Sequence, residues 1–171
     1  MEIKYINSGI NIPWDFNVII EISENMPTKY EFNKKVGTIF VDRFLHTSMT
    51  YPINYGFIPH TMAKDGDPCD AMVLFREPLI PCSVIRVRPI GVLIMEDEAG
   101  QDEKILCVPH QKIDPYYNDI KSYHDLPKVK LNQIEHFFKC YKDLEKDKWV
   151  KITGWQNAEI AAQMIEHQII K

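Results

Sequence analysis

The sequence lacks the closely spaced cysteines and histidines that build zinc sites and dithiol redox centres. Its four cysteines are Cys69, Cys82, Cys107 and Cys140, which form no CxxC pair, and its six histidines include no HExxH motif. Zinc and redox motifs need such spacing because their side chains must meet at one point. We therefore expect reduced thiols, as is usual in a cytosol, and no zinc centre.

The sequence also lacks long apolar runs and an excess of positive charge. Residues 1–17 have neither the basic start nor the apolar run of a signal peptide, and no later stretch reaches membrane-spanning length. The net charge of -4 and the pI near 5.9 give no general attraction to nucleic acid or to anionic membranes. We expect a cytoplasmic protein without nucleic-acid or membrane partners, which binds any phosphate compound through a local site.

Short β-strands are the dominant pattern of the first part of the chain. The 171 residues, 45% of them hydrophobic, suit one domain spanning 1–171, and no repeat, low-complexity tract or Gly/Ser linker divides it. Runs rich in Val, Ile and aromatic residues, bounded by Gly, Pro or Asp, predict strands. These runs are 18–22, 38–44, 71–75, 83–95, 105–108 and 149–153. They indicate a compact barrel or sheet.

Two later segments have helical periodicity instead. In 131–144, apolar residues recur at spacings of three and four, at Ile134, Phe137, Phe138, Tyr141 and Leu144. A second apolar face spans about 158–169, with Asn157 placed as its N-cap. The chain is therefore predicted to be mainly β, followed by two amphipathic helices.

Residues 65–70 read Asp-Gly-Asp-Pro-Cys-Asp, which places three carboxylates within six residues. Crowded carboxylates repel one another unless a cation offsets their charge, so a metal site is one explanation. A solvated acidic turn explains the stretch equally well on its own, because Asp and Gly favour turns. A calcium EF-hand is excluded, since Asp70 stands where its loop needs Gly and Arg76 where it needs Glu.

A second acidic group surrounds an expected hairpin turn at 99–101, and taken alone it is more typical of an exposed charged turn. It comprises Asp97, Glu98, Asp102 and Glu103. Considered together, the two acidic groups supply oxygen ligands only, which suits a hard ion such as Mg²⁺ better than zinc.

Several basic and phenolic side chains could bind phosphate. Lys29 and Glu31 would project from one face of an extended segment, and the guanidinium of Arg43 suits bidentate contact with phosphate oxygens. Taken alone, each of these residues is more typical of an exposed ion pair or a solvated charge than of a phosphate ligand. Tyr55 and Tyr141 carry hydroxyls that can donate to phosphate, although the periodicity around Tyr141 favours a buried position.

These residues together resemble the soluble family I inorganic pyrophosphatases, most closely the bacterial members. The resemblance covers about 12–165 and is carried, in the family's order, by Lys29-Tyr30-Glu31, Val41-Asp42-Arg43-Phe44, Tyr51-Pro52, Asn54-Tyr55-Gly56, the stretch 65–70, Asp97-Glu98-Ala99-Gly100, Asp102, Lys104, His136-Phe137-Phe138 and Tyr141-Lys142-Asp143-Leu144-Glu145. It implies a five-stranded, closed, OB-like β-barrel with two flanking α-helices, usually assembled as a homohexamer. The implied reaction is hydrolysis of inorganic pyrophosphate to two orthophosphates by a metal-activated water, which drives pyrophosphate-releasing biosynthesis forward.

The resemblance also implies roles for individual residues. Asp65, Asp70 and Asp102 would bind the tightest metal, Asp97 with Asp102 a metal that arrives with substrate, and Glu31 a further one. Mg²⁺ is the expected ion, with several per active site and with Mn²⁺ or Zn²⁺ as substitutes. Lys29, Arg43, Tyr55, Lys104, Tyr141 and Lys142 would bind the two phosphoryl groups, and Asp67 would be the general base. Glu21, Tyr51 and Glu98 are further expected active-site residues, although the loop between Glu21 and Lys29 is one residue shorter than the family pattern.

Cys69 departs from the family pattern, which more often has an aliphatic residue there, and it suggests sensitivity to thiol reagents if the side chain is accessible. Two other functions fit parts of the sequence. A nucleic-acid-binding barrel would need a basic, aromatic groove, which the acidic clusters disfavour. A metal-dependent phosphohydrolase acting on nucleotides would use the same metals and cations, and only the family likeness and the lack of a GxxxxGK loop disfavour it. An inactive family member should have lost some acidic or basic positions, and the expected ones are all present.

Overall fold

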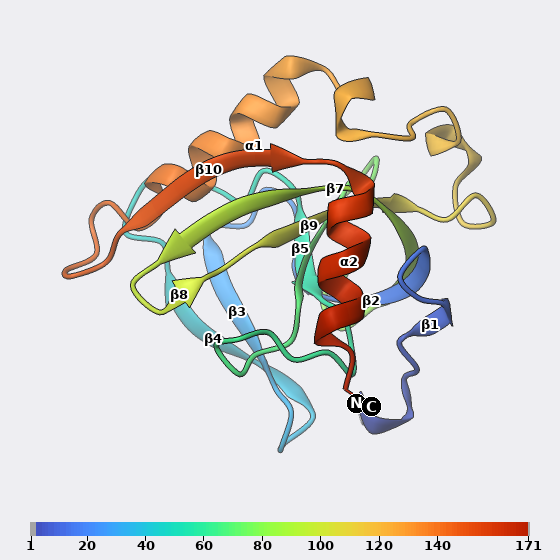
Figure 1. The fold of residues 1–171 in the computed structure, drawn as a ribbon. Coiled ribbons are helices and arrows are strands. Elements are labelled where there is room, and N and C mark those ends of the chain that lie inside the picture. Colours follow the sequence, from blue (N-terminus) through green and yellow to red (C-terminus); the bar gives the residue numbers. More distant parts are fainter. Residues whose placement is uncertain (1–2, 171) are drawn as a thin grey trace.

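Five strands pair into a closed ring in the computed structural model, which describes residues 3–170 (Figure 1). In their order around the ring, the strands are β2 (Asp15–Ile22), β5 (Asn54–Phe57), β6 (Asp70–Val73), β9 (Lys104–Pro109) and β7 (Val84–Asp97). The pairing of β7 with β2 closes the ring. The β6–β9 pair is parallel and the other four are antiparallel. The five-stranded, OB-like barrel expected from the sequence is thereby confirmed.

The remaining strands extend or flank the ring. β1 (Gly9–Asn11) pairs with β2, β8 (Gly100–Gln101) turns back onto β7, and β10 (Val150–Gln156) adds to the second half of β7. β3 (Thr28–Asn33) and β4 (Thr38–Phe44) form a separate hairpin that projects from the ring (Figure 1). Single 3₁₀ turns lie at Ile3–Tyr5, Pro115–Tyr117 and Tyr123–Asp125.

The long strand β7 pairs with four strands, and a bulge between Pro89 and Gly91 shifts its register against β9. Its first residues pair with β2, its middle with β9 and its last with β10. The strand pattern predicted for this region was therefore correct. The short strands β1, β3, β5 and β8 were not predicted, and β5 shows why: all four of its residues are buried, so it lacks the alternation typical of a strand with one exposed face.

Both predicted helices are present, with different ends for the first. α1 (Lys128–Cys140) begins directly after Pro127, three residues before the predicted start, and ends before Tyr141, whose N–H donates to the Phe137 carbonyl at 2.8 Å. Lys128 and Lys130 are polar and Val129 is exposed, so this first turn adds nothing to the apolar face, which explains the late predicted start. α2 (Ala158–Gln168) is capped as predicted, because the Asn157 side chain accepts a hydrogen bond from the Ile160 N–H at 3.0 Å.

Alternate residues of the strands enter two separate hydrophobic clusters. Along β6, Met72 joins one cluster while Ala71 and Val73 join the other. The first cluster includes the apolar face of α1 and the second includes Ala161 and Ile165 of α2. The period of two along each strand thus lets one sheet anchor a helix on each side. Burying a large side chain in such a cluster contributes about 1.5–3 kcal/mol.

Gly56 allows β5 and β2 to approach closely. A Cβ placed on Gly56 would lie 1.9 Å from the Ile19 carbonyl oxygen, far inside van der Waals contact. Any larger residue would separate the two strands and move Tyr55, which neighbours Gly56 on β5. No helix in the part of the chain that the structure describes has both the length and the apolar content needed to cross a bilayer.

Candidate active site

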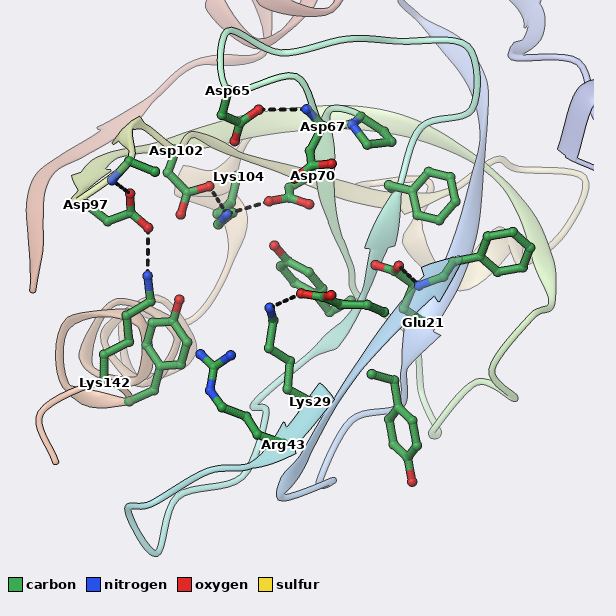
Figure 2. A pocket seen from close by; sticks show the side chains of 18 of the residues that line it. Glu21, Lys29, Arg43, Asp65, Asp67, Asp70, Asp97, Asp102, Lys104 and Lys142 are labelled. Carbon is green, nitrogen blue, oxygen red and sulfur yellow. Dashed lines mark hydrogen bonds and ion pairs between the residues drawn. The ribbon is translucent and has the colours of Figure 1, made fainter. Parts of the chain in front are cut away.

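An open cavity of about 430 Å³ lies between the β3–β4 hairpin, the loop 65–70, the turn between β7 and β9, and the end of α1. All but one of the predicted site residues line it. They are Glu21, Lys29, Glu31, Arg43, Tyr55, Asp65, Asp67, Asp70, Asp97, Glu98, Asp102, Lys104, Tyr141 and Lys142. Figure 2 shows the aspartates along one wall, with Lys29, Arg43 and Lys142 across from them. The fold therefore gathers side chains that are more than 100 residues apart in sequence.

The aspartate loop, residues 65–70, is shaped by a local hydrogen bond within the acidic motif. The Asp65 side chain accepts from the Asp67 N–H at 3.0 Å, as aspartates do in tight turns. Gly66, between them, has φ +92°, a left-handed conformation that favours glycine. The loop thus places Asp65 and Asp67 on an exposed turn, whereas Asp70 begins strand β6.

Lys104 lies between two of the predicted metal ligands. Its ammonium group contacts Asp70 at 2.5 Å and also pairs with Asp102 (Figure 2), and the residue is only 3% exposed. Burial alone would lower the pKa of Lys104, but the two carboxylates raise it above its ordinary value. Burial raises the pKa of Asp102 and the charge of Asp70 raises it further, while the charge of Lys104 lowers it only in part.

A second buried lysine pairs with the acids of the β7–β8 turn. The Lys142 ammonium lies 2.6 Å from an Asp97 oxygen and 3.4 Å from a Glu98 oxygen. Glu98 also pairs with Lys148. Burial would raise the pKa of Glu98, but the hydrogen bond from Lys148 and the charge of Lys142 lower it to about 2. Glu98 is therefore a carboxylate at any physiological pH.

The β3–β4 hairpin supplies the cations of the opposite wall. Lys29 and Glu31 share one face of β3 and form an ion pair, as their spacing predicted. Lys29 also lies 3.3 Å from Asp42 on β4. Arg43 donates through Nε to Glu145 at 3.0 Å and contacts Asp42 through Nη1, which leaves further guanidinium N–H groups for an anion.

Two tyrosines have both a structural and a cavity-lining position. Tyr55 and Tyr141 belong to the hydrophobic cluster around α1, and both also line the cavity. Burial raises the pKa of each phenol, so both hydroxyls remain protonated donors. Tyr51 is the predicted residue that does not line the cavity. It is 2% exposed, and its ring is buried in the apolar cluster beneath the site, where it packs against Phe137 with ring centroids 4.7 Å apart.

Glu21 lines the cavity, although the loop between it and Lys29 is one residue shorter than in the family pattern. Its carboxylate accepts a hydrogen bond from the Phe32 N–H at 2.7 Å, which links β2 to the hairpin. Burial raises the pKa of Glu21 to about 8, and the charges of Asp70 and Glu31 add to the effect. The charge of Lys29 offsets this only in part, so burial dominates the pKa of Glu21.

Three charged residues at or beside the cavity were not predicted as site residues from the sequence: Lys34, Lys148 and Glu145. Lys34 and Lys148 line the cavity, and Glu145 orients Arg43. Lys34 lies in the turn between β3 and β4, and Lys148 precedes β10, so neither stands beside a recognised motif. Glu145 did belong to a matching sequence block, but only its contact with Arg43 reveals what it does.

Cys69 is buried behind the aspartate loop. The side chain is 3% exposed, and burial together with the Asp70 charge raises the pKa of the thiol. The accessible thiol that would make the protein sensitive to alkylation is therefore not seen. The other cysteines of residues 3–170 are also free thiols.

The side chains of the cavity fit a hard divalent cation in their chemistry. The groups of metal-binding type that line it are carboxylates, with neither His nor Cys among them. Within residues 3–170, no three such side chains converge closely enough to enclose a metal ion, and Lys104 and Lys142 form ion pairs with Asp70 and Asp97. Burial raises the pKa values of Asp102 and Glu21, and neighbouring carboxylates raise them further, so a cation bound beside them would oppose these shifts.

Comparison with known proteins gives concordant results. The family model described as inorganic pyrophosphatase matches residues 18–171. The chain is 57% identical, over 99% of its length and 95% of the relative's, to the inorganic pyrophosphatase of Rhodospirillum rubrum. It is similar to the solved inorganic pyrophosphatase of Coxiella burnetii, with 48% identity and a TM-score of 0.93 over 96% of this chain and 98% of the other. It is also similar to that of Thermus thermophilus, with 39% identity and a TM-score of 0.94 over 99% of this chain and 97% of the other.

In the protein kept free of metal by a chelator, Glu21→Gln should raise the free energy of unfolding, increasingly from about pH 4.5 to about pH 8. The folded parent retains the Glu21 proton up to a pKa of about 8, whereas the unfolded chain releases it near 4.5. The parent therefore loses stability as the pH rises through this window, and Gln cannot ionise. Urea unfolding at several pH values measures the difference. The control is Glu77→Gln, which removes an exposed carboxylate outside the cavity. A gain that does not change with pH would contradict the raised pKa.

Proposed function

This chain belongs to the inorganic pyrophosphatase family, and from that premise we propose that it hydrolyses inorganic pyrophosphate to two orthophosphates with the help of divalent cations. The observation that supports this most directly is the arrangement of one cavity, with a wall of aspartates on one side and Lys29, Arg43 and Lys142 across from it. A small polyanion needs cationic donors, and carboxylates next to it need metal ions to offset their repulsion. Removal of pyrophosphate would drive the biosynthetic reactions that release it.

Asp65, Asp70, Asp97, Asp102 and Glu31 are the proposed metal ligands, with Mg²⁺ as the ion. When bound, such cations neutralise charge on phosphate oxygens and lower the pKa of a water molecule. Asp70 and Asp102 already lie close enough to share the Lys104 ammonium, which supports their assignment to one site. Asp97, at the end of β7, contacts Lys142 instead, which supports its assignment to a different position.

Lys29, Arg43, Lys104 and Lys142, with the hydroxyls of Tyr55 and Tyr141, are the proposed phosphate ligands. Each of the four cations is already paired with a carboxylate, so its position in the wall is fixed before substrate binds. Donors that are fixed in advance lose little entropy when the anion arrives. As the bond to the leaving phosphate breaks, these donors stabilise the charge that develops on it.

Asp67 is the proposed general base. Its side chain is 81% exposed and lies on the turn of the aspartate loop, facing the cavity with Lys34 at 4.0 Å. Its exposed carboxylate can accept the proton of the attacking water and release it to solvent. Asp67 donates its backbone N–H to Asp65, so the turn that positions the base also carries a proposed metal ligand.

Assembly as a homohexamer and a cytoplasmic location are further parts of the proposal, as is the treatment of residues 1–171 as one domain. Identity above 50% to bacterial inorganic pyrophosphatases over nearly the whole chain supports them. Light scattering after size exclusion measures the mass of the assembly, and a monomeric mass would contradict the hexamer.

Phosphate release should be fast from pyrophosphate with Mg²⁺ present, and lost when a chelator removes the metal. ATP and a simple phosphate ester should release little, because a cavity lined on both sides by charged side chains suits a small anion of two phosphoryl groups better than an organic substituent. A colorimetric phosphate assay with the three substrates measures this. Preferential release from ATP would favour a nucleotide phosphohydrolase, and no release from any substrate would favour an inactive family member.

Asp67→Asn should lower kcat by about 10²–10⁴-fold, the usual contribution of a general base, while the fold and most metal binding remain. Asparagine keeps the shape of the side chain and cannot accept the proton. Steady-state kinetics, with Mg²⁺ titration calorimetry as the second measurement, separate these effects. Asp119→Asn, an exposed aspartate outside the cavity, is the charge-matched control. Unchanged turnover in Asp67→Asn would remove this residue from the base role.

A further inference from the structure

The aspartate loop is fastened at its base by a residue that does not line the cavity, Thr61. The Thr61 side chain is buried, with the residue 4% exposed, and its hydroxyl makes two hydrogen bonds. It donates to the Ile58 carbonyl at 2.6 Å and accepts from the Cys69 N–H at 2.9 Å. The hydroxyl thus connects the end of the strand that enters the loop with the residue at which the loop returns to the sheet.

The Cys69 peptide is the anchored point of the loop. Its carbonyl accepts from the Ile58 N–H at 2.9 Å, so both polar groups of Cys69 are bound to the segment 58–61. The preceding residue, Pro68, has no N–H to donate, which makes Cys69 the first backbone donor after Asp67. The position of Cys69 therefore sets how the exposed turn with Asp67 connects to Asp70.

Thr61 is itself held in place by the end of the chain. It forms an isolated antiparallel bridge with Ile169, directly after α2. The Met62 N–H donates to the Gln168 carbonyl at 2.7 Å, and the Ile170 N–H donates to the His60 carbonyl at 3.0 Å. α2 packs against β7 of the barrel, so this bridge ties the base of the loop to the rigid part of the fold.

We infer that Thr61 is a positioning residue for pyrophosphate hydrolysis, which acts by fixing the aspartate loop through the Cys69 N–H. Without the hydroxyl, the buried N–H of Cys69 has no partner, and the loop must move for that group to reach water. Movement of the loop displaces Asp67 relative to Asp70, and small displacements of reacting groups have large effects on rate. The inference rests on the proposed function, since it assigns Thr61 a role in that reaction.

The test compares Thr61→Val, which keeps the shape of the side chain and removes the hydroxyl, with Thr61→Ser, which keeps the hydroxyl. In Thr61→Val, we expect faster hydrogen–deuterium exchange in peptides covering 58–70 of the metal-free protein and weaker binding of Mg²⁺ alone by calorimetry. We also expect kcat to fall on the order of 10–100-fold, with a smaller change in KM. Thr61→Ser should restore all three properties to near the parent values.

Ser122→Ala is the matched control, because it removes another hydroxyl that accepts a backbone N–H, that of His124, away from the cavity. If Thr61→Val loses thermal stability as this control does, but keeps parental exchange at 58–70, Mg²⁺ binding and kcat, the inference is overturned. Should Thr61→Val not fold, the parent and Thr61→Ser decide the matter: slow exchange at 58–70 in both supports the inference, and exchange as fast as in an exposed turn overturns it. A parent without pyrophosphatase activity would contradict the proposed function. Hydrogen–deuterium exchange at 58–70 and Mg²⁺ binding would still test whether Thr61 fixes the position of the loop.

Discussion

The cavity depends on the balance between its carboxylates and the buried ammonium groups of Lys104 and Lys142. Each lysine would lose its charge more readily in an apolar interior, and each carboxylate would take up a proton. Paired, they keep their charges, and Lys104 lies between Asp70 and Asp102 where these two acids would otherwise repel each other. The protein thus carries a strongly polar site in the side of a hydrophobic barrel without a large unpaired charge.

The barrel makes this balance possible because it fixes the partners on different strands. Asp70 begins β6 and Lys104 begins β9, and these strands are the parallel pair of the ring. Parallel neighbours start at the same edge of a sheet, so the two side chains meet at one end of the barrel. Lys142 arrives from the end of α1, whose aromatic face is buried against the same part of the sheet. Packing of apolar side chains is therefore what positions the charges.

Ion pairing does not account for the whole cavity, because the pKa values of both Glu21 and Asp102 are raised. The Glu21 carboxylate is buried and accepts a hydrogen bond from the Phe32 N–H, and its pKa is raised to about 8. Groups with strongly shifted pKa values gather at functional sites, since catalysis needs charges that are not fully neutralised by the protein alone.

Much of the fold could be predicted from local sequence patterns, and the resemblance to a known family selected residues that, with the exception of Tyr51, line one cavity. Hydrophobic periods of two and of three to four residues specified the main strands and both helices, and the spacing of Lys29 and Glu31 placed them on one face of β3. The closure of the ring by β2 and β7 was seen only in the tertiary structure. So were the contacts that Lys104, Lys142 and Glu145 make with charged side chains distant in sequence. The tertiary structure also decided that Tyr51 and Cys69 are buried outside the cavity, since burial depends on neighbours from other elements. A residue's type and spacing are local properties, whereas its charge partners and its exposure are set by the packing of the whole chain.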